Sequence, residues 1–247
     1  MKITAIIPAR LRSDRLPEKL LIEVNGKTIL RYVFEKVKSS KLFDRIIIAT
    51  DSKRILLEAE SFGAEVIMTS KNHKTGTDRI AEVSKKIKTD IIVNVQGDEP
   101  LIQRSHLKAI IDLIKKKNVE IATLCTAFES KKDVQDISNV KLIKDSTHRA
   151  IYFSRSVIPY ASDIINPKDF LHHVGLYAFK RKTLGKLAKL KQSPLEKRER
   201  LEQLRWIENG FDIYVAKVKG RTISIDTPAD FRAFVRHLAA KNKVGSL

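Results

Sequence analysis

The sequence predicts an α/β fold in which a mostly parallel, Rossmann-like sheet is flanked by helices and a smaller α+β lobe is inserted. Through the first half of the chain, short apolar runs alternate with helical patterns, as in βαβ units. Polar residues gather directly after the apolar runs, at the expected carboxyl edge of the sheet. The alternation loosens between about residues 141 and 179 and then returns. With 247 residues, 43% of them hydrophobic, the chain is long enough to bury a large core.

The first half contains four expected strands and three expected helices. Residues 3–7, 45–50, 65–68 and 90–95 are short apolar runs that predict buried strands. Between them, a helix is predicted from about Thr28, where Ile29, Val33 and Val37 recur at helical spacing, and further helices over 52–61 and 77–87. After the first strand, a polar and basic stretch predicts a long loop up to Lys19.

The second half predicts the inserted lobe and the return to the core. A helix over 105–117 and a strand over 120–128 are followed by short strand-like runs over 141–179. A helix over 195–209, a strand over 213–218 and a closing helix over 227–240, with Pro228 in its first turn, complete the pattern. We therefore expect a single domain, 1–247, whose core is formed by about 1–135 and 206–247 and whose inserted lobe is formed by about 136–205.

Composition restricts the class of partner. The 48 Lys and Arg residues exceed the 29 acidic residues, for a formal charge of +19, which predicts attraction to polyanions or small anionic substrates. The lysines are spread along the chain with little aromatic interleaving, so nucleic-acid binding is only a remote alternative. The single Cys125 excludes an intramolecular disulfide, and its apolar setting predicts an inert core thiol. No apolar run approaches the roughly 18 residues of a spanning helix. The apolar stretch before Pro8 is too short for a secretory signal, so none is expected. A cytoplasmic protein without membrane insertion is expected.

Two segments carry candidate chemistry. The loop after the first strand holds Arg10, Arg15 and Lys19, cations suited to a triphosphate, although a plain solvated loop would look similar. The strand over 91–95 runs directly into Asp98 and Glu99, and carboxylates at that edge suit Mg²⁺, for which Asp98 is the expected ligand. A P-loop is excluded at Gly26-Lys27-Thr28, because Leu21 stands where that motif requires glycine.

The segments Ile7-Pro8-Ala9-Arg10, Arg15-Leu16-Pro17 and Lys19 resemble the nucleotide-binding signature of the CMP-sugar synthetase family. That resemblance implies that Arg10 and Lys19 hold the phosphates of CTP, with Arg15 nearby. The full set of CTP-binding residues expected on this basis is Pro8, Ala9, Arg10, Arg15, Lys19, Ser70, Arg79 and Gln96.

Two further elements match the same family. Gly76-Thr77-Asp78-Arg79 resembles its Gly-Thr-Asp/Glu-Arg element, although Asp78 could serve only the helix dipole. Ser224-Ile225-Asp226-Thr227-Pro228 resembles its Val-Asp-Thr-Pro element, which implies that Asp226 is the second metal ligand. In relatives a glycine usually stands next to that element, whereas Gly220 lies six residues before Asp226.

Three motifs in the expected lobe resemble the branch of the family specific for 3-deoxy-manno-octulosonate (Kdo): Tyr152 to Ser156, His172 to Tyr177, and Leu201 to Arg205. The sugar-binding residues implied are Arg155, His173, Tyr177, Glu202 and Gln203. A cation for the sugar carboxylate and acceptors for its hydroxyls make chemical sense, although two adjacent histidines are often an ordinary strand pair. The resemblance also implies that the lobe binds sugar and forms a homodimer.

The implied reaction is transfer of CMP from CTP to the anomeric hydroxyl of Kdo, for lipopolysaccharide synthesis. The hydroxyl would attack the α-phosphorus in line and pyrophosphate would leave, with Mg²⁺ held by Asp98 and Asp226. The catalytic residues expected are Arg10, Lys19, Asp98 and Asp226. The alternative sugars are 8-amino-Kdo and a sialic-acid-like ketose. The remote alternative, a basic nucleic-acid-binding protein, would show steeply salt-dependent binding.

Overall fold

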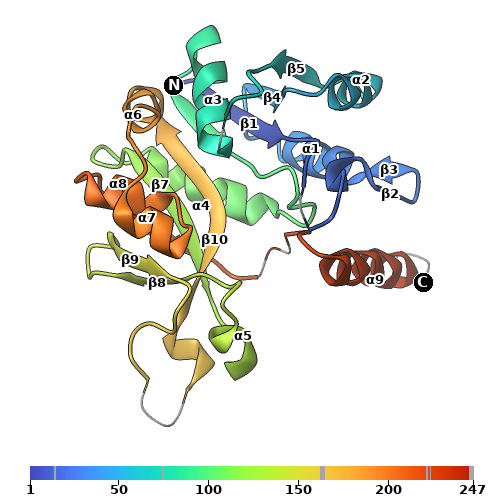
Figure 1. Cartoon of the computed structure of the whole chain (residues 1–247). Coiled ribbons are helices and arrows are strands. Elements are labelled where there is room, and N and C mark those ends of the chain that lie inside the picture. The colour runs from blue at the N-terminus through green and yellow to red at the C-terminus, as the bar shows by residue number, and fades with distance from the viewer. Residues whose placement is uncertain (14, 74, 162–164, 221, 223, 245–247) are drawn as a thin grey trace. The chain divides into compact units, whose positions relative to one another are not determined.

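A computed structural model describes the chain except residues 14, 74, 162–164, 221, 223 and 245–247, and except the side chains of 241–244. The chain divides into two units (Figure 1). The N-terminal unit consists of Lys2–Lys88, Asn94–Arg104 and Thr222–Leu247. The central unit consists of Thr89–Val93 and Ser105–Arg221, together with Met1.

The N-terminal unit is built on parallel strands in the order β1 (Ile3–Ala9), β4 (Arg45–Thr50), β5 (Glu65–Met68). All seven residues of β1 are buried, as expected for a parallel strand covered on both faces. The connections are α1 (Ile29–Ser39), α2 (Lys53–Ser61) and α3 (Gly76–Lys86), which pack on these strands. The βαβ pattern predicted for this part of the sequence is confirmed.

The start of the chain differs from expectation in one respect. β1 extends through Pro8 and Ala9, which pair with Ala49 and Thr50, so these two residues belong to the strand and not to the loop. The stretch up to α1 is also more regular than predicted, with a 3-10 helix, η1 (Lys19–Leu21), and a hairpin of β2 (Glu23–Val24) and β3 (Lys27–Thr28).

The Gly26-Lys27-Thr28 triplet forms a turn, and the helix that follows begins beside Thr28, as predicted. Asn25 and Gly26 have φ of 52° and 71°, the left-handed conformation of a tight hairpin turn. Thr28 is the N-cap of α1, and its hydroxyl accepts a hydrogen bond from the amide of Arg31 at 3.2 Å. The triplet therefore connects secondary structure and does not form a phosphate-binding loop.

The central unit contains a mixed set of strands. β11 (Tyr214–Lys217) is parallel to β7 (Ile121–Ala127), which is antiparallel to β10 (Leu171–Lys180). β8 (Lys141–Lys144) pairs with β10 and with β9 (Ala150–Ser154). β10 is thus one ten-residue strand, where the sequence predicted only short runs, and its register shifts between Val174 and Tyr177. Such irregularities disrupt the simple alternation of apolar and polar residues.

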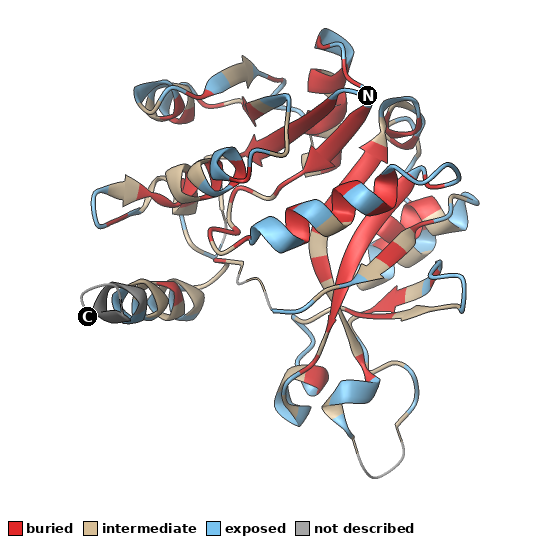
Figure 2. Ribbon diagram, turned by 180° about the vertical axis from the view of Figure 1, so that it is seen from behind, coloured by how far each residue is buried: buried red, intermediate tan, exposed pale blue. Residues whose placement is uncertain are grey.

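The helices of this unit lie between the strands in sequence. They are α4 (Arg104–Ile114), α5 (Lys131–Gln135), the 3-10 helix η2 (Pro167–Asp169), α6 (Arg181–Leu187), α7 (Pro194–Glu199) and α8 (Gln203–Glu208). The striping of α4 in Figure 2 shows its amphipathic pattern, buried toward the core and exposed outside. Cys125 is fully buried on β7, and burial raises the pKa of its thiol to about 11. The prediction of an unreactive core thiol is confirmed.

The helix predicted over 195–209 is wrong as a single element. Arg200 adopts φ 55° and ends α7, and α8 begins at Gln203. The physical reason lies in burial, because four consecutive residues of α8, 203–206, are buried, whereas only Glu196 of the six residues of α7 is buried. A straight helix could not turn four adjacent positions inward and keep its preceding turns in solvent.

The strand β6 (Ile91–Asn94) and the closing helix α9 (Pro228–Val244) match their predicted positions. Asn94 belongs to the N-terminal unit, where the amide of Val95 donates to the carbonyl of Ile6 at 3.1 Å. Within the described residues, no helix is both long enough and apolar enough to cross a membrane.

Candidate functional site

The ammonium of Lys19 lies between the two carboxylates expected to bind metal. Lys19 Nζ is 2.5 Å from Asp98 Oδ2 and 2.8 Å from Asp226 Oδ1, although the two acids are 128 positions apart in the sequence. Arg15 Nη2 lies 3.1 Å from Asp226 Oδ2. The side chain of Lys19 is only 13% exposed, whereas that of Arg15 is 61% exposed. The N-terminal unit therefore brings together four of the residues singled out from sequence.

Asp98 is held by the close approach of two chain segments. A Cβ added to Gly97 would lie 3.1 Å from the carbonyl oxygen of Pro8 and 3.3 Å from Leu20 Cδ1, so only glycine lets the 96–98 turn lie this close to the end of β1. On the other side, the amide of Ile225 donates to the carbonyl of Asp98 at 2.9 Å. This bond places Asp226 beside Asp98.

The segment before α9 is fixed by a helix cap. Asp230 Oδ2 accepts from the amides of Asp226 and Thr227 at 3.2 and 2.8 Å. Thr227 Oγ1 in turn accepts from the amide of Asp230 at 3.3 Å. This reciprocal arrangement is a capping box. The cap orients Asp226 without involving its carboxylate, and the spacing from Gly220 does not displace it from Asp98.

Burial and charge work in opposite directions at this cluster. Burial alone would lower the pKa of Lys19, but the Asp98 charge and the hydrogen bonds to both carboxylates outweigh it, and its pKa is raised. The neighbouring Glu99 is buried, and burial followed by the Asp98 charge raises its pKa to about 8, although a hydrogen bond with Thr222 opposes the shift. Glu99 is therefore mostly protonated at neutral pH.

The donor chemistry at Asp98 and Asp226 fits a hard divalent cation. Both carboxylates already direct oxygens at one cation, the Lys19 ammonium. Across the described part of the chain, no group of three or more His, Cys, Asp or Glu residues is arranged to hold a metal ion. Two carboxylates are the usual protein contribution to a Mg²⁺ site, where substrate phosphates and water complete the shell.

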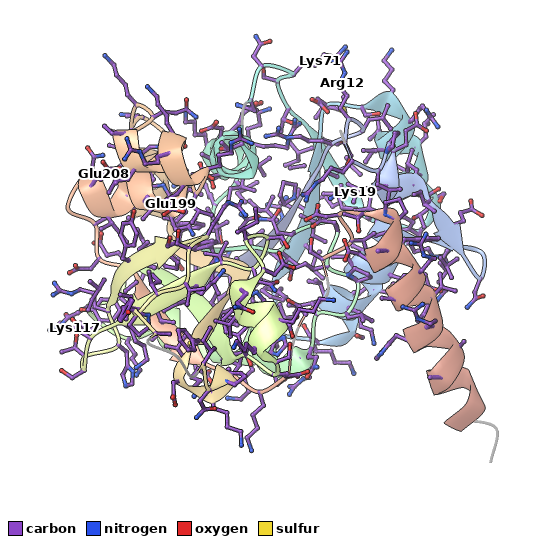
Figure 3. The ribbon with its side chains drawn as sticks, turned by 60° about the horizontal axis from the view of Figure 1, so that its bottom comes forward. Arg12, Lys19, Lys71, Lys117, Glu199 and Glu208 are labelled. Atoms are coloured by element: carbon purple, nitrogen blue, oxygen red, sulfur yellow. The ribbon has the colours of Figure 1, made fainter. Side chains whose placement is uncertain are left out.

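The other residues predicted to contact nucleotide surround the end of β1. Arg10 directly follows that strand and is partly buried. A Cβ on Gly76, at the start of α3, would lie 3.4 Å from Pro8 Cγ and 4.0 Å from Gln96 Oε1, so Pro8, Gln96 and this helix start are neighbours. Figure 3 shows Arg12 and Lys71 projecting outward from the loops after β1 and β5, while Lys19 lies further inside.

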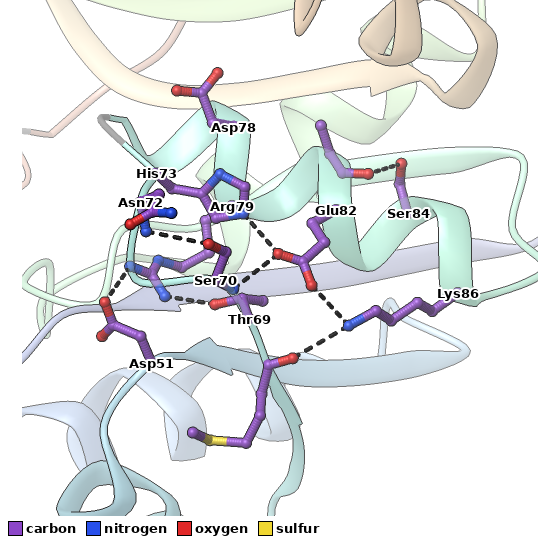
Figure 4. Close-up of polar contacts among 12 residues, drawn as sticks. Asp51, Thr69, Ser70, Asn72, His73, Asp78, Arg79, Glu82, Ser84 and Lys86 are labelled. Carbon is purple, nitrogen blue, oxygen red and sulfur yellow. Dashed lines mark hydrogen bonds and ion pairs between the residues drawn. The ribbon is translucent and has the colours of Figure 1, made fainter.

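Arg79 is placed differently from its sequence neighbours. Its side chain is fully buried, with Nη2 2.9 Å from Asp51 Oδ2 and Nη1 2.5 Å from Thr69 Oγ1 (Figure 4). Asp51 follows β4 and Thr69 follows β5, so Arg79 ties two loops at the carboxyl edge to α3. Asp78 forms a capping box with Thr75, which supports its structural interpretation.

Asp51 and Thr69 were not singled out from sequence. The signal was present, because each is a polar residue directly after a strand, at the edge where ligands bind in such sheets. Ser70 follows Thr69 and is exposed; its amide donates to Glu82 Oε2 at 2.9 Å.

In the central unit, aromatic residues from β10 and α8 pack together. His173 lies between Phe153 and Tyr177, with ring centroids 5.1 and 5.4 Å away, and Tyr177 packs edge-on against Trp206 at 5.2 Å. Burial, followed by the neighbouring His172, lowers the pKa of His173 to about 3. The imidazole is therefore neutral at pH 7.

Thr123 on β7 contacts both His173 and the backbone of β10. The hydroxyl of Thr123 lies 3.0 Å from His173 Nε2, 2.9 Å from the carbonyl of Leu176 and 3.3 Å from the carbonyl of Val174. These contacts fix the position of the imidazole ring within the cluster.

The cluster also carries polar groups, on Tyr177, Trp206 and the nearby Gln203. Burial and then the Glu202 charge raise the pKa of Tyr177 well above its ordinary value, so its phenol stays protonated. Gln203 Nε2 and Trp206 Nε1 are buried without a hydrogen-bond partner among the described residues. Buried donors of this kind are rare unless a ligand or water satisfies them.

Arg155 is not part of this cluster in the described structure. The Arg155 guanidinium donates two hydrogen bonds of 3.0 Å, from Nε to the carbonyl of Glu199 and from Nη1 to the carbonyl of Ile137. The backbone amide of Arg155 donates to Glu199 Oε2 at 2.9 Å. The sequence offered no sign of these partners, since Ile137 lies in the turn after α5 and Glu199 at the end of α7, both far from Arg155 in the sequence. Near Glu202 in the sequence, Arg205 forms a buried bidentate ion pair with Glu196. The distance is 2.8 Å from Arg205 Nε to Glu196 Oε2 and 2.7 Å from Arg205 Nη2 to Glu196 Oε1.

The chain is similar to known proteins over nearly its full length. Residues 4–217 match the cytidylyltransferase family. The 3-deoxy-manno-octulosonate cytidylyltransferase of Koribacter versatilis is 41% identical over 98% of this chain and 92% of its own length. That of Geobacter metallireducens is 42% identical over 97% of this chain and 98% of its own length.

Solved structures agree. The structure of CMP:2-keto-3-deoxy-manno-octonic acid synthetase complexed with CTP matches with a TM-score of 0.91 and 35% identity, over 98% of this chain and 100% of the other. The 4-diphosphocytidyl-2C-methyl-D-erythritolsynthase of Anaerococcus prevotii, at 17% identity and a TM-score of 0.63, shares the fold alone. The predicted fold, a mostly parallel Rossmann-like nucleotidyltransferase sheet flanked by helices, is confirmed.

Proposed function

The chain belongs to the cytidylyltransferase family, and on that premise we propose that it transfers CMP from CTP to the anomeric hydroxyl of Kdo, releasing pyrophosphate. The near full-length similarity to 3-deoxy-manno-octulosonate cytidylyltransferases supports this substrate pair. The single structural observation that carries it is the convergence of Lys19, Asp98 and Asp226 at the carboxyl edge of the N-terminal unit. A nucleotidyltransferase needs cations for a triphosphate and carboxylates for a metal at one place.

The N-terminal unit supplies the nucleotide-binding residues in this proposal. Arg10, Arg15 and Lys19 bind the triphosphate, and their positive charge stabilises the pyrophosphate as it leaves. Pro8 and Ala9 are buried in β1 and contribute by placing Arg10 at the end of the strand. Gln96 adjoins them, and Ser70 contacts the nucleotide from the loop after β5. Because Arg79 is buried against Asp51 and Thr69, it contributes by fixing these loops and not by direct contact.

Asp98 and Asp226 would hold Mg²⁺. When bound, the ion supplies positive charge that neutralises the phosphates and lowers the pKa of the attacking sugar hydroxyl. The protein's own part is to hold the two carboxylates side by side, through the Ile225–Asp98 backbone bond and the cap at Asp230. The hydroxyl oxygen forms a bond to the α-phosphorus as the bond to the pyrophosphate oxygen breaks, and the hydroxyl proton passes to solvent water.

Residues of the central unit select the sugar in this proposal, with 136–205 as a sugar-binding lobe. His173 presents a neutral imidazole, Tyr177 a neutral phenol, and Glu202 an acceptor for sugar hydroxyls. The buried donors Gln203 Nε2 and Trp206 Nε1 are suited to the oxygens of a carboxylated sugar. Arg155 remains a proposed carboxylate ligand, which would require it to leave its bonds with the Glu199 and Ile137 carbonyls.

Pyrophosphate release tests the proposal. Purified enzyme is given CTP and Mg²⁺ with Kdo, 8-amino-Kdo or sialic acid in parallel. Release with Kdo is expected to exceed release with the other sugars. Asp98→Ala should lose activity by about 100-fold or more, as is typical when a group that stabilises transition-state charge is removed.

The matched control is Asp112→Ala, which removes an exposed carboxylate that pairs with Lys108 on α4. This variant should keep wild-type activity. Preference for another sugar would leave the chemistry standing and overturn the choice of Kdo. Absence of release with every sugar would overturn the enzyme assignment, and salt-dependent binding to DNA or RNA would then be the next measurement.

Two further properties belong to the proposal. The chain acts in the cytoplasm, where CTP is made, and it forms a homodimer, as the family resemblance implies. Light scattering on the purified protein checks the second point, with a mass near twice 28.1 kDa expected. A mass of 28.1 kDa at assay concentrations would contradict it.

A further inference from the structure

Glu82 on α3 gathers three hydrogen-bond donors, two of which belong to the loop that follows β5 (Figure 4). Its Oε2 accepts from the amide of Ser70 at 2.9 Å and lies 2.6 Å from His73 Nε2. Its Oε1 accepts from Lys86 Nζ at 2.7 Å. Residues 69–73 are here called the 69–73 loop. The Glu82 carboxylate, in the middle of α3, thus holds this loop against the helix.

The first residue of the loop, Thr69, is held by Arg79, which lies about one turn before Glu82 on α3. Arg79 Nη1 donates to Thr69 Oγ1 at 2.5 Å, and the amide of Thr69 donates to the carbonyl of Thr50 at 2.8 Å. Within the loop, the amide of Asn72 donates to Ser70 Oγ at 3.1 Å. The loop therefore has a defined shape that depends on polar contacts.

Packing cannot account for this shape. Ser70, Lys71 and Asn72 are exposed, and the loop buries little apolar surface. Exposed loops without such surface are ordinarily among the least stable parts of a protein. The loop lies at the carboxyl edge of the sheet, where ligands bind. An exposed loop fixed by buried and half-buried polar side chains is typical of a preorganised binding element.

We propose that Glu82 is a positioning residue for CTP: it holds the 69–73 loop in the conformation that receives the nucleotide, so that binding does not have to order it. This inference rests on the proposed function, because the contact between Ser70 and CTP is itself part of that proposal. Glu82 itself touches neither substrate. Its loss should therefore weaken nucleotide affinity and leave the chemical step and sugar binding nearly unchanged.

The test compares Glu82→Ala, Glu82→Gln and Lys86→Met. Lys86→Met is the matched control, because it removes one donor from Glu82 and leaves the bonds to Ser70 and His73. It also removes the 3.2 Å hydrogen bond from Lys86 Nζ to the carbonyl of Met68, which lies in β5 before the loop. For Glu82→Ala, the Kd for CTP by calorimetry and the KM for CTP should rise about 10-fold, as when a loop must be ordered on binding. Its kcat and its KM for Kdo should stay within about twofold of wild type.

The conservative variant separates positioning from bulk stability. Glu82→Gln keeps one oxygen for Ser70 and should restore most of the CTP affinity. Hydrogen exchange of peptides that contain the 69–73 loop should quicken in Glu82→Ala and not in Lys86→Met. Should Glu82→Ala fail to fold, His73→Ala, which removes one bond of the same set, should raise the KM for CTP about threefold.

Three results would overturn the inference. They are unchanged CTP affinity in folded Glu82→Ala, a loss in kcat with unchanged KM for CTP, or equal losses in Glu82→Ala and Lys86→Met. Each is read against a wild-type enzyme that releases pyrophosphate from CTP. If wild type itself does not use CTP, the proposed function fails first, and the two failures are thereby distinguished.

Discussion

Lys19 Nζ lies 2.5 Å from Asp98 Oδ2, so the ammonium proposed to bind phosphate is also the counter-ion of a proposed metal ligand. The same ammonium lies 2.8 Å from Asp226 Oδ1. A divalent cation and this ammonium cannot both occupy the space between the two oxygens. Phosphates that attract Lys19 would release the carboxylates, which couples nucleotide binding to metal binding.

The first prediction concerns metal affinity without nucleotide. Lys19→Met removes the competing ammonium, so Mn²⁺ should bind more tightly than to wild type, by about 10-fold, when measured by electron paramagnetic resonance. The same variant should lose about 100-fold or more in kcat/KM. Lys27→Met, which removes the exposed partner of Glu35, should change neither quantity. Weaker Mn²⁺ binding in Lys19→Met would contradict the competition.

The second prediction concerns the glycine beside Asp98. Gly97→Ala places a Cβ 3.1 Å from the Pro8 carbonyl oxygen, so the turn must move. We expect a loss of about 1–3 kcal/mol in the free energy of unfolding and a loss of activity, since Asp98 moves with the turn. Urea unfolding and pyrophosphate release measure the two effects.

Gly185 provides the matched control for that substitution. It lies in α6, and a Cβ there meets nothing within 4 Å. Gly185→Ala should therefore stabilise the protein by about 0.5–1 kcal/mol, because alanine loses less backbone freedom in a helix. Equal destabilisation by both substitutions would show that close packing at Gly97 is not the cause.

The third prediction concerns the buried ion pair beneath the proposed sugar residues. Both side chains of the Arg205–Glu196 pair are 6% exposed, so Arg205→Met leaves a buried carboxylate without its cation. The expected cost is about 3–5 kcal/mol in urea unfolding. The double variant Arg205→Met with Glu196→Leu should recover much of it, because no charge is then left buried. Equal destabilisation in the single and double variants would contradict this account.

Periodicity and strand ends predicted much of the N-terminal unit. The run at 45–50 and that at 65–68 became β4 and β5 with the predicted bounds. The last four residues of β4 are buried, as a continuous apolar segment predicts, whereas all four residues of β5 are exposed or half-buried, so the prediction of burial there was wrong. The break at Arg200 was missed because a left-handed arginine has no sequence signature. The ten-residue β10 was missed because histidines and a register shift interrupt its pattern.

The sequence predicted those site residues that belong to local motifs. It could not predict contacts between residues that are distant in the sequence. Asp98 follows a strand, and so the sequence could place it at the edge. Nothing local could show that Lys19 would lie between Asp98 and Asp226, since the contact spans 207 positions. Arg79 was expected among nucleotide contacts, yet its partners Asp51 and Thr69 turn it inward.

The last prediction concerns pH and His173. Burial lowers the pKa of this imidazole to about 3, whereas an unfolded histidine titrates near 6.5. Between these values the unfolded chain binds one proton more than the folded chain, so the free energy of unfolding rises with pH across this window. Above pH 6.5 this protonation costs the folded protein no stability. As the pH falls from 6.5 toward 3, the free energy of unfolding decreases by at most about 1.4 kcal/mol per pH unit. Urea unfolding at pH 7.0, 6.0 and 5.0 measures the slope in wild type and in His173→Gln. The variant should show a shallower slope, whatever its stability at pH 7. Parallel slopes in wild type and His173→Gln would show that His173 is accessible to protons in the folded state.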